Sequence, residues 1–281
     1  MAGASESSQA ELEVKATLAQ VKRLQSERAY RDRCGLFYVE GVRNFVQVVD
    51  NRFEISTIVH SEKLLTAPLA RKLFRNARRS GICSVSVSPE QFRQISQSDR
   101  ASGIGAIVHQ RWSQLQNVSP QAGLCWVVLE TVRSPGNLGT LIRTSEAVGG
   151  AGFIILGGRI DPFDPDVIRA SMGAIFHQQF VRTNFSALHQ WIHRHKCQVI
   201  GASPDGTSNL HQFNYPPATL LLLGEERQGL TQQQRDLCQH LVRIPMSGMA
   251  DSLNLAVAGS LLMYKVYRSA TVLKTDSLPR F

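Results

Sequence analysis

The 281-residue sequence lacks the features of several protein classes. Its five cysteines are widely spaced and form no C-x-x-C pair, which excludes a disulfide framework and a zinc ribbon and fits reduced thiols. Apolar runs such as residues 220–223 are far shorter than the ~18 residues of a membrane-spanning helix. The first twenty residues contain Glu6, Glu11 and Glu13 and no apolar h-region, so neither a secretory signal nor a transit peptide is expected. We therefore expect a cytoplasmic protein without membrane contact.

Acidic residues are the scarcer charged type. The chain has 31 Lys and Arg against 22 Asp and Glu, a net charge of +9, and residues 1–112 alone hold 17 basic and 11 acidic residues. Hydrophobic residues make up 43% and charged residues 19%, a balance typical of globular proteins. The excess of positive charge favours a polyanionic partner for the N-terminal part, although a solvated basic surface gives the same count.

The periodicity of apolar residues predicts two α/β domains: residues 1–112, a linker at 113–122, and a domain at 123–272 followed by a tail at 273–281. In the first domain we expect a polar leader at 1–11 and a basic amphipathic helix at 12–33. Strands at 35–41, 55–60, 83–87 and 105–109 should alternate with helices at 42–49 and 67–80. In the second, continuous apolar strands at 124–129, 153–156, 198–202, 220–223 and 241–245 predict a parallel sheet covered by helices on both faces.

A glycine-containing turn follows the strand at 124–129 and reads R-S-P-G-N-L-G-T-L-I-R over residues 133–143. Its glycines are spaced G-x-x-G, and no G-x-G-x-x-G follows, so a dinucleotide-binding motif is rejected. The turn places Asn137 and Arg143 near a helix start, where backbone N–H groups favour an anion. An ordinary turn with a surface arginine is the alternative interpretation.

Two further motifs follow later strands. Residues 224–230 read G-E-E-R-Q-G-L, and Thr231 with Gln234 then predicts a capping box. Residues 243–258 contain I-P-M and S-L-N and lead into a helix reaching Arg268, for which Asp251 or Ser252 can serve as the cap. The helix is apolar nearly all round, which predicts burial, and its small residues make it a candidate subunit contact.

Together the three motifs resemble those of the SpoU-type (TrmH-like) RNA 2′-O-ribose methyltransferases of the SPOUT class. The family's N-x-G-x-x-x-R, G-x-E-x-x-G-L and I-P-M…S-L-N patterns are matched at 137–143, 224–230 and 244–254, and its F-x-V-E-G-x-R segment at 37–43. The chain departs from the family's usual residues with Glu225 in place of Asn, and with Leu255-Ala256 in place of Val-Ser.

The resemblance implies an α/β fold in which a C-terminal SPOUT domain with a parallel sheet and a deep trefoil knot follows a small α/β RNA-binding domain. It also implies S-adenosylmethionine as cofactor, a homodimer formed through the C-terminal domain, and RNA as substrate, with ribosomal RNA favoured over tRNA. The catalytic residues implied are Asn137, Arg143, Glu226, Ser252 and Asn254. The cofactor would contact Leu223, Gly224, Gly229, Ile244, Met246 and Leu253. The RNA would contact Arg43, Arg71, Arg75, Arg78, Arg79 and Arg169.

Other functions are less favoured by the sequence. His189 and His193 stand at i, i+4 but lack the H-E-x-x-H glutamate and a third ligand, so no metal is expected. Asp161, Asp164 and Asp166 read as a solvated turn, and no G-x-S-x-G elbow supports a hydrolase. The main alternative is a non-catalytic RNA-binding or ribosome-assembly protein that keeps the fold. A tRNA guanine-N1 methyltransferase is a distant third, since its aspartate-based site has no counterpart here.

Overall fold

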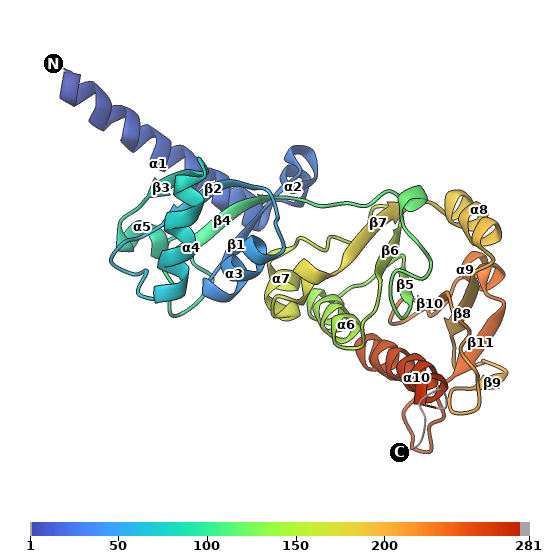
Figure 1. The fold of residues 1–281 in the computed structure, drawn as a ribbon. Coiled ribbons are helices and arrows are strands. Elements are labelled where there is room, and N and C mark those ends of the chain that lie inside the picture. The colour runs from blue at the N-terminus through green and yellow to red at the C-terminus, as the bar shows by residue number, and fades with distance from the viewer. Residues whose placement is uncertain (1, 276–281) are drawn as a thin grey trace. The chain divides into compact units, whose positions relative to one another are not determined.

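The computed structural model describes the backbone of residues 2–275 and the side chains of residues 8–271; most of the predicted tail at 273–281 therefore lies outside the described residues. The chain forms two compact units. One comprises Met1–Arg111 with Phe163–Ile168, and the other Trp112–Pro162 with Arg169–Phe281. Each unit has its own sheet and its own hydrophobic core (Figure 1).

The first unit contains a four-stranded sheet of order β1-β4-β2-β3, in which only β2 and β3 are parallel. Its strands are β1 (Leu36–Glu40), β2 (Ile55–His60), β3 (Cys83–Ser86) and β4 (Ile104–His109). Its helices are α1 (Ala2–Ser26), α2 (Arg28–Cys34), α3 (Val42–Asp50), α4 (Pro68–Arg79) and α5 (Pro89–Arg93). The predicted strands and the helices α3 and α4 are confirmed.

Two predictions for the N-terminus are wrong. Residues expected as a polar leader belong to α1, which begins at Ala2. The single helix expected over 12–33 is two helices, because Glu27 adopts an extended conformation with φ −110° and ψ 100°. The short helix α5 was not predicted, although Ser88 and Gln91 form a capping box at its start.

The segment 163–168 packs within the first unit, although it lies far along the sequence. Phe163 is buried, with its ring centroid 4.8 Å from that of Phe37. Asp164 accepts a hydrogen bond at 3.2 Å from Arg31, whose side chain is only 3% exposed. The prediction of a solvated turn is therefore wrong for Asp164, which pairs with a buried guanidinium, and residues 165–171 form the helix α7 (Pro165–Ser171).

The second unit is built on a seven-stranded sheet of order β7-β6-β5-β10-β8-β11-β9, in which every neighbouring pair is parallel. Its strands are β5 (Trp126–Leu129), β6 (Gly152–Leu156), β7 (Gln179–Thr183), β8 (Gln198–Ala202), β9 (Ser208–Asn209), β10 (Thr219–Leu223) and β11 (His240–Arg243). The α-helices of this unit, apart from α7, are α6 (Pro135–Ala147), α8 (Phe185–His195), α9 (Gln232–Leu237) and α10 (Leu255–Thr275).

Both faces of this sheet are covered, which is why its strands are continuously apolar. Leu220 and Leu222 belong to the core shared with α8 and α9. On the opposite face α10 packs on α6 and β10 so closely that a Cβ on Gly259 would lie 2.4 Å from Leu141 Cδ2 and 2.8 Å from Leu223 Cδ1. The predicted parallel sheet is confirmed.

Helix α10 is not buried all round, contrary to the prediction. Leu262, Met263 and Val266 are buried. The opposite side carries Val257, Leu261, Tyr264 and Tyr267, which are 49%, 42%, 54% and 45% exposed. The apolar residues of α10 thus form one face that packs on the sheet and a second face that is exposed to solvent in the single chain.

Candidate active site

The first motif lies where β5 leads into α6. Ser134 is the N-cap residue and Pro135 occupies the first turn, a position that tolerates its missing N–H. Asn137 follows in the first turn and is half-buried. The helix packs tightly there, since a Cβ on Gly139 would lie 2.4 Å from the Cβ of Ala170. The motif's glycine therefore allows the close packing that fixes the start of α6 and, with it, Asn137.

The second motif is a tight loop after β10. Glu225 and Gly229 exchange two backbone hydrogen bonds, at 3.1 and 2.9 Å. Gly229 adopts φ +66°, and a Cβ on Gly224 would lie 2.3 Å from the carbonyl carbon of Gly229. Glycine is thus required at 229 by the positive φ and at 224 by the close approach of the backbone. The loop presents Glu226 toward the first motif.

The third motif ends at the start of α10. The side-chain oxygen of Asn254 accepts hydrogen bonds from the backbone N–H groups of Ala256 and Val257, at 2.9 and 3.3 Å. Asn254 therefore caps the helix, and the prediction that Asp251 or Ser252 does so is wrong. The amide nitrogen of Asn254 remains available for a second partner.

That partner links the three motifs. Asn254 Nδ2 donates to Asn137 Oδ1 at 3.0 Å, and Asn137 Nδ2 donates to Glu226 Oε1 at 3.2 Å. The backbone N–H of Arg133 also donates to the Glu226 carboxylate, at 3.2 Å to Oε1. The side-chain amides of Asn137 and Asn254 each accept a hydrogen bond with the oxygen and donate one with the nitrogen. The orientation of both amides is therefore fixed. We call Asn137, Glu226 and Asn254 the motif triad.

A cavity of about 390 Å³ opens between the second and third motifs. All six residues expected to contact the cofactor line it, together with the expected catalytic residues Glu226 and Ser252. The six are Leu223, Gly224, Gly229, Ile244, Met246 and Leu253. Its walls combine apolar side chains with the backbone of two loops, the usual lining of a small-molecule site.

One wall of this cavity was not predicted. It is formed by residues 202–205, directly after β8, and by Arg235 of α9. Arg235 donates to Ser203 Oγ and to the Asp205 carboxylate, both at 3.2 Å. The sequence did carry a signal, because Pro204, Asp205 and Gly206 are turn residues after an apolar strand, at the edge where α/β proteins place ligands.

Glu225, which departs from the family's usual Asn, pairs with Arg133. Burial opposes ionisation of the carboxyl, but the backbone N–H of Gln228, at 3.1 Å, and the Arg133 guanidinium outweigh it and lower the pKa of Glu225. The pair joins the loop before α6 to the loop after β10, next to the motif triad. The substitution thus replaces a neutral side chain with one end of an ion pair.

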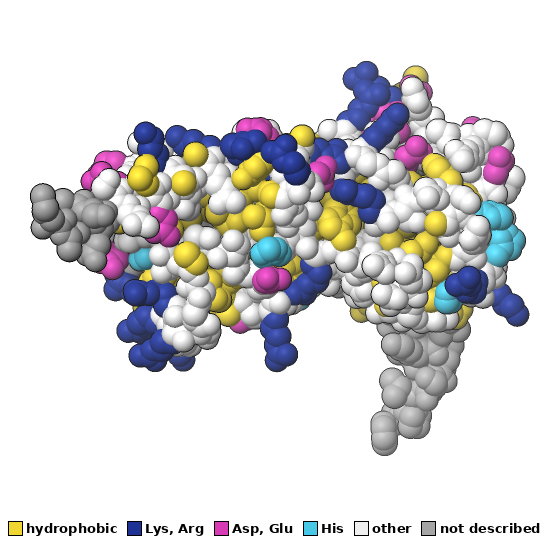
Figure 2. Space-filling model, turned by 90° about the horizontal axis from the view of Figure 1, so that it is seen from above, with side chains coloured by type: hydrophobic (Ala, Val, Ile, Leu, Met, Phe, Trp, Pro, Cys, Tyr) yellow, Lys and Arg dark blue, Asp and Glu magenta, His cyan; other side chains and the backbone are white. Residues whose placement is uncertain are grey.

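The expected arginines are not part of this cavity. Arg143 is exposed on α6, and Arg169 is exposed in the last turn of α7. In the first unit the expected RNA contacts are exposed on α3 and on the outer face of α4, whose inner face buries Ala70, Phe74 and Ala77. These are Arg43, Arg71, Arg75, Arg78 and Arg79. Figure 2 shows clusters of Lys and Arg side chains on this unit.

Known proteins share both units. Residues 125–264 match the SpoU rRNA Methylase family, and residues 15–106 match the MRM3-like substrate binding domain. An rRNA methyltransferase from Sinorhizobium meliloti, solved with AdoMet bound, is 30% identical; the match covers 90% of this chain and 94% of that one, with a TM-score of 0.82. The chain belongs to the SpoU rRNA methylase family.

Two further relatives of this SpoU methylase come from Streptomyces viridochromogenes. The SpoU methyltransferase AviRb, solved in complex with AdoMet, is 28% identical over 91% of this chain and 98% of its own, with a TM-score of 0.83. A protein named 23S rRNA (uridine(2479)-2′-O)-methyltransferase is 28% identical over 271 residues, which are 94% of this chain and 93% of that protein. The family resemblance seen in the motifs is confirmed.

Two features of the structure bear on membrane proteins and metalloproteins. Within residues 2–275 no helix is long and apolar enough to span a bilayer. Among the described side chains no group of three or more His, Cys, Asp and Glu has the arrangement of a metal site. His189 and His193 do approach each other, with 3.1 Å between their Nε2 atoms.

Proposed function

We propose that this SpoU methylase transfers a methyl group from S-adenosylmethionine to a ribose 2′-hydroxyl of ribosomal RNA in the cytoplasm. One observation carries the proposal: the motif triad joins three distant parts of the sequence at a cavity lined by all the residues expected to contact the cofactor. The names of the relatives support ribosomal RNA as the substrate.

The cavity suits S-adenosylmethionine. Its volume of about 390 Å³ lies within the range of ~300–1,000 Å³ typical of small-ligand sites. Leu223, Ile244 and Leu253 supply apolar surface for an adenosyl group, and the glycine loop leaves backbone atoms accessible at Gly224, where a side chain would collide with Gly229. When bound, the cofactor supplies a methyl group on a sulfonium leaving group.

The residues of the chain have to align and desolvate the attacking 2′-hydroxyl. The motif triad ties the start of α6 and the start of α10 to Glu226, which lines the cavity together with Ser252. Arg143 would bind the RNA phosphate and stabilise the developing alkoxide. A guanidinium stays protonated at neutral pH and is a poor base, so its role is electrostatic.

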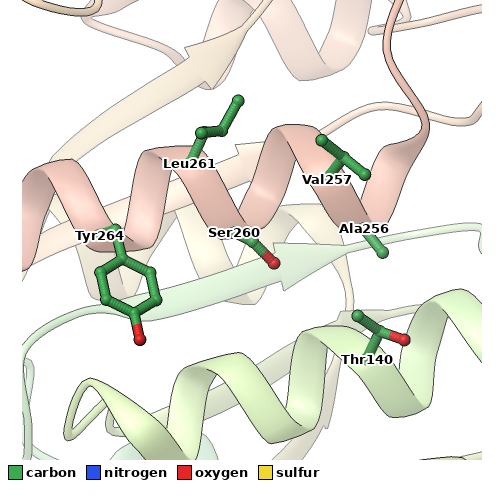
Figure 3. A pocket seen from close by; sticks show the side chains of 6 residues that line it. All are labelled: Thr140, Ala256, Val257, Ser260, Leu261 and Tyr264. Atoms are coloured by element: carbon green, nitrogen blue, oxygen red, sulfur yellow. The ribbon is translucent and has the colours of Figure 1, made fainter.

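The proposal includes a homodimer formed through α10 and α6. A hollow of about 260 Å³ lies between Thr140 on α6 and five residues of α10. In Figure 3, Ser260 and Tyr264 point toward α6, whereas Val257 and Leu261 point away from it. This exposed apolar face would be covered by a second copy. Arg143 follows Thr140 by three residues and so lies on the same side of α6, which would place it at the interface, within reach of a partner's cavity.

The deep trefoil knot is part of the same proposal. In support, β10 is hydrogen-bonded between β5 and β8, although both of these strands precede it in the chain. The chain then continues through α9 and the strand β11, which pairs with β8, before α10 packs against β10 and α6. The hydrogen bonds of the motif triad join the three motif segments within this part of the chain.

The first unit is proposed as the RNA-binding domain. Its match to a substrate-binding domain and the exposed arginines of α4 support this role. Arg71 and Arg75 line a hollow of about 320 Å³ that also contains the buried His60. Contacts between such arginines and phosphates weaken steeply as salt concentration rises.

The test is to map 2′-O-methyl groups in ribosomal RNA from cells with the gene, without it, and with Arg143→Ala. We expect one site or a few sites to lose methylation in the deletion and in the variant, while calorimetry shows little change in the variant's affinity for S-adenosylmethionine. An identical methylation profile in all three strains, together with no cofactor binding by the purified protein, would favour the non-catalytic RNA-binding alternative. If the Arg143→Ala variant methylates RNA at the unchanged rate, the role proposed for Arg143 is refuted, but the proposed function is not.

A further inference from the structure

A second polar cavity lies in the second unit, away from the motif triad. It has a volume of about 530 Å³ and is formed by the segment 112–116, the end of β7 and one side of α8. We call it the edge cavity, because β7 is the terminal strand of the sheet. The side chains that matter for its chemistry are Trp112, Gln114, Arg182, Gln190, Trp191 and Arg194.

The edge cavity combines cationic, aromatic and amide groups. The Arg182 guanidinium carbon lies 4.2 Å from the centroid of the Trp112 ring, so cation and ring are stacked. Arg194 adds a second exposed cation, and Gln114 and Gln190 offer amide donors and acceptors. None of the residues lining this cavity is acidic. An anionic ligand with a flat ring system matches this lining.

One residue that lines the edge cavity, Trp191, carries a buried donor without an acceptor. Trp191 is 4% exposed, and its indole N–H has no hydrogen-bond acceptor among the described residues. The buried Trp126 of the same unit differs, because its indole N–H donates to the Ser119 carbonyl at 3.0 Å. A buried donor without an acceptor costs about 1–3 kcal/mol.

The position of the edge cavity relates it to the active site. Arg182 pairs in register with Ile155, Ile155 with Leu129, and Leu129 with Leu223, so all four residues stand in one row across the parallel sheet. Three strand spacings of about 4.8 Å place Arg182 about 14 Å from Leu223, at the same carboxyl edge of the sheet. At about 3.4 Å per stacked nucleotide, some four nucleotides span that distance.

We propose that the edge cavity binds an unpaired nucleotide of the RNA substrate, a few nucleotides along the strand from the methylated ribose. The base would extend the stack of Trp112 and Arg182, and Arg194 would meet a phosphate. This inference rests on the proposed function, since it assigns a second contact to the same RNA. The site fixes which nucleotide reaches the methyl donor by holding the strand at a set distance from it.

The experiment uses the full-length protein and short single-stranded oligonucleotides of uridine or adenosine, measured by fluorescence anisotropy, with methyl transfer to ribosomal RNA in parallel. The variants are Arg182→Ala, Trp112→Leu and Arg194→Ala. Lys196→Gln, which removes an exposed positive charge at the C-terminal end of α8 outside the cavity lining, is the matched control. Arg182→Lys keeps the positive charge and loses the planar guanidinium, so it distinguishes stacking on the base from electrostatic attraction to the RNA.

We expect Arg182→Ala and Trp112→Leu each to weaken oligonucleotide binding about fivefold or more, since stacking of one base is worth about that much or more. KM for RNA should rise by a similar factor while kcat and cofactor affinity stay near those of Lys196→Gln. Arg182→Lys should recover less than half of the lost affinity. Should Trp112→Leu fail to fold, Arg182→Ala and Arg194→Ala still test the site.

Three outcomes would overturn the inference. In one, all variants bind RNA within about twofold of the control. In another, Arg182→Lys behaves like the unmodified protein, so that charge alone matters. In the third, free uridine or adenosine monophosphate binds as tightly as the oligonucleotide, which marks a site for a mononucleotide. Methyl transfer by the unmodified protein in any of these cases leaves the proposed function standing, whereas its absence would count against that function.

Discussion

Replacing Gly224 with alanine tests whether the loop after β10 holds the cofactor. A Cβ at this position would lie 2.3 Å from the carbonyl carbon of Gly229, 2.5 Å from its oxygen and 2.5 Å from the nitrogen of Leu230. All three are backbone atoms, so the whole loop must move to make room. Overpacking of this kind typically costs about 1–3 kcal/mol. A loss of the same free energy from cofactor binding raises the Kd of S-adenosylmethionine about 5- to 150-fold.

The measurement is isothermal titration calorimetry with S-adenosylmethionine, below the melting temperature of every variant. Gly248→Ala is the matched control: it lies in the loop before α10, and its added methyl would meet no atom within 4 Å. We expect the control to bind the cofactor like the unmodified protein. A Kd for Gly224→Ala within about twofold of the control, in a protein that melts normally, would show that the cofactor does not depend on this loop, and the assignment of the cavity would fall.

The other predictions concern the motif triad and the open face of α10. Glu226→Gln replaces a carboxylate that accepts charge-assisted hydrogen bonds worth about 1.5–3 kcal/mol each, so methyl transfer should fall about tenfold or more. The control Asp236→Asn, on the exposed side of α9, should retain full activity, and equal rates for both variants would contradict the role of the triad. Leu261→Asp puts a charge on the exposed apolar face, so sedimentation should detect monomers, and a variant that remains a dimer would exclude this face as the interface.

The sequence was sufficient to predict the parallel sheet and most of its strands. Continuous apolar runs such as residues 220–223 identify strands that are covered on both faces. The edge strand β7 was missed because Gln179 and Arg182 are exposed, so its pattern is not the continuous apolar run of the central strands. Strand β9 has only two residues, too few for any periodicity to be visible.

The residues of the candidate active site were named from their motifs, but the hydrogen bonds that join them were not predicted. Asn254 and Glu226 are 117 and 89 residues from Asn137, and nothing local in the sequence indicates which amide atom faces which partner. The helix cap was misassigned because Asp251, Ser252 and Asn254 are equally good cap residues. Only the point at which the backbone becomes helical decides among them.

Long-range partners outside the motifs also escaped prediction. Arg31 pairs with Asp164 across 133 residues of sequence, and an aspartate in a proline-containing stretch looks the same whether it is solvated or bound to a buried guanidinium. Arg235 and Asp205 illustrate the same limit in the cavity wall, where each residue alone resembles ordinary surface charge. Such pairs become visible only when the fold brings their elements together.

The two polar atoms of the Asn254 side chain serve two different parts of the structure. Its oxygen starts the helix whose far side is open to a second copy, and its nitrogen belongs to the row that ends at Glu226. Aspartate can replace asparagine as a cap, but it cannot donate. A substitution that keeps the helix cap but loses the donor would therefore break the link to the first motif, so this one residue couples the proposed dimer surface to the candidate active site.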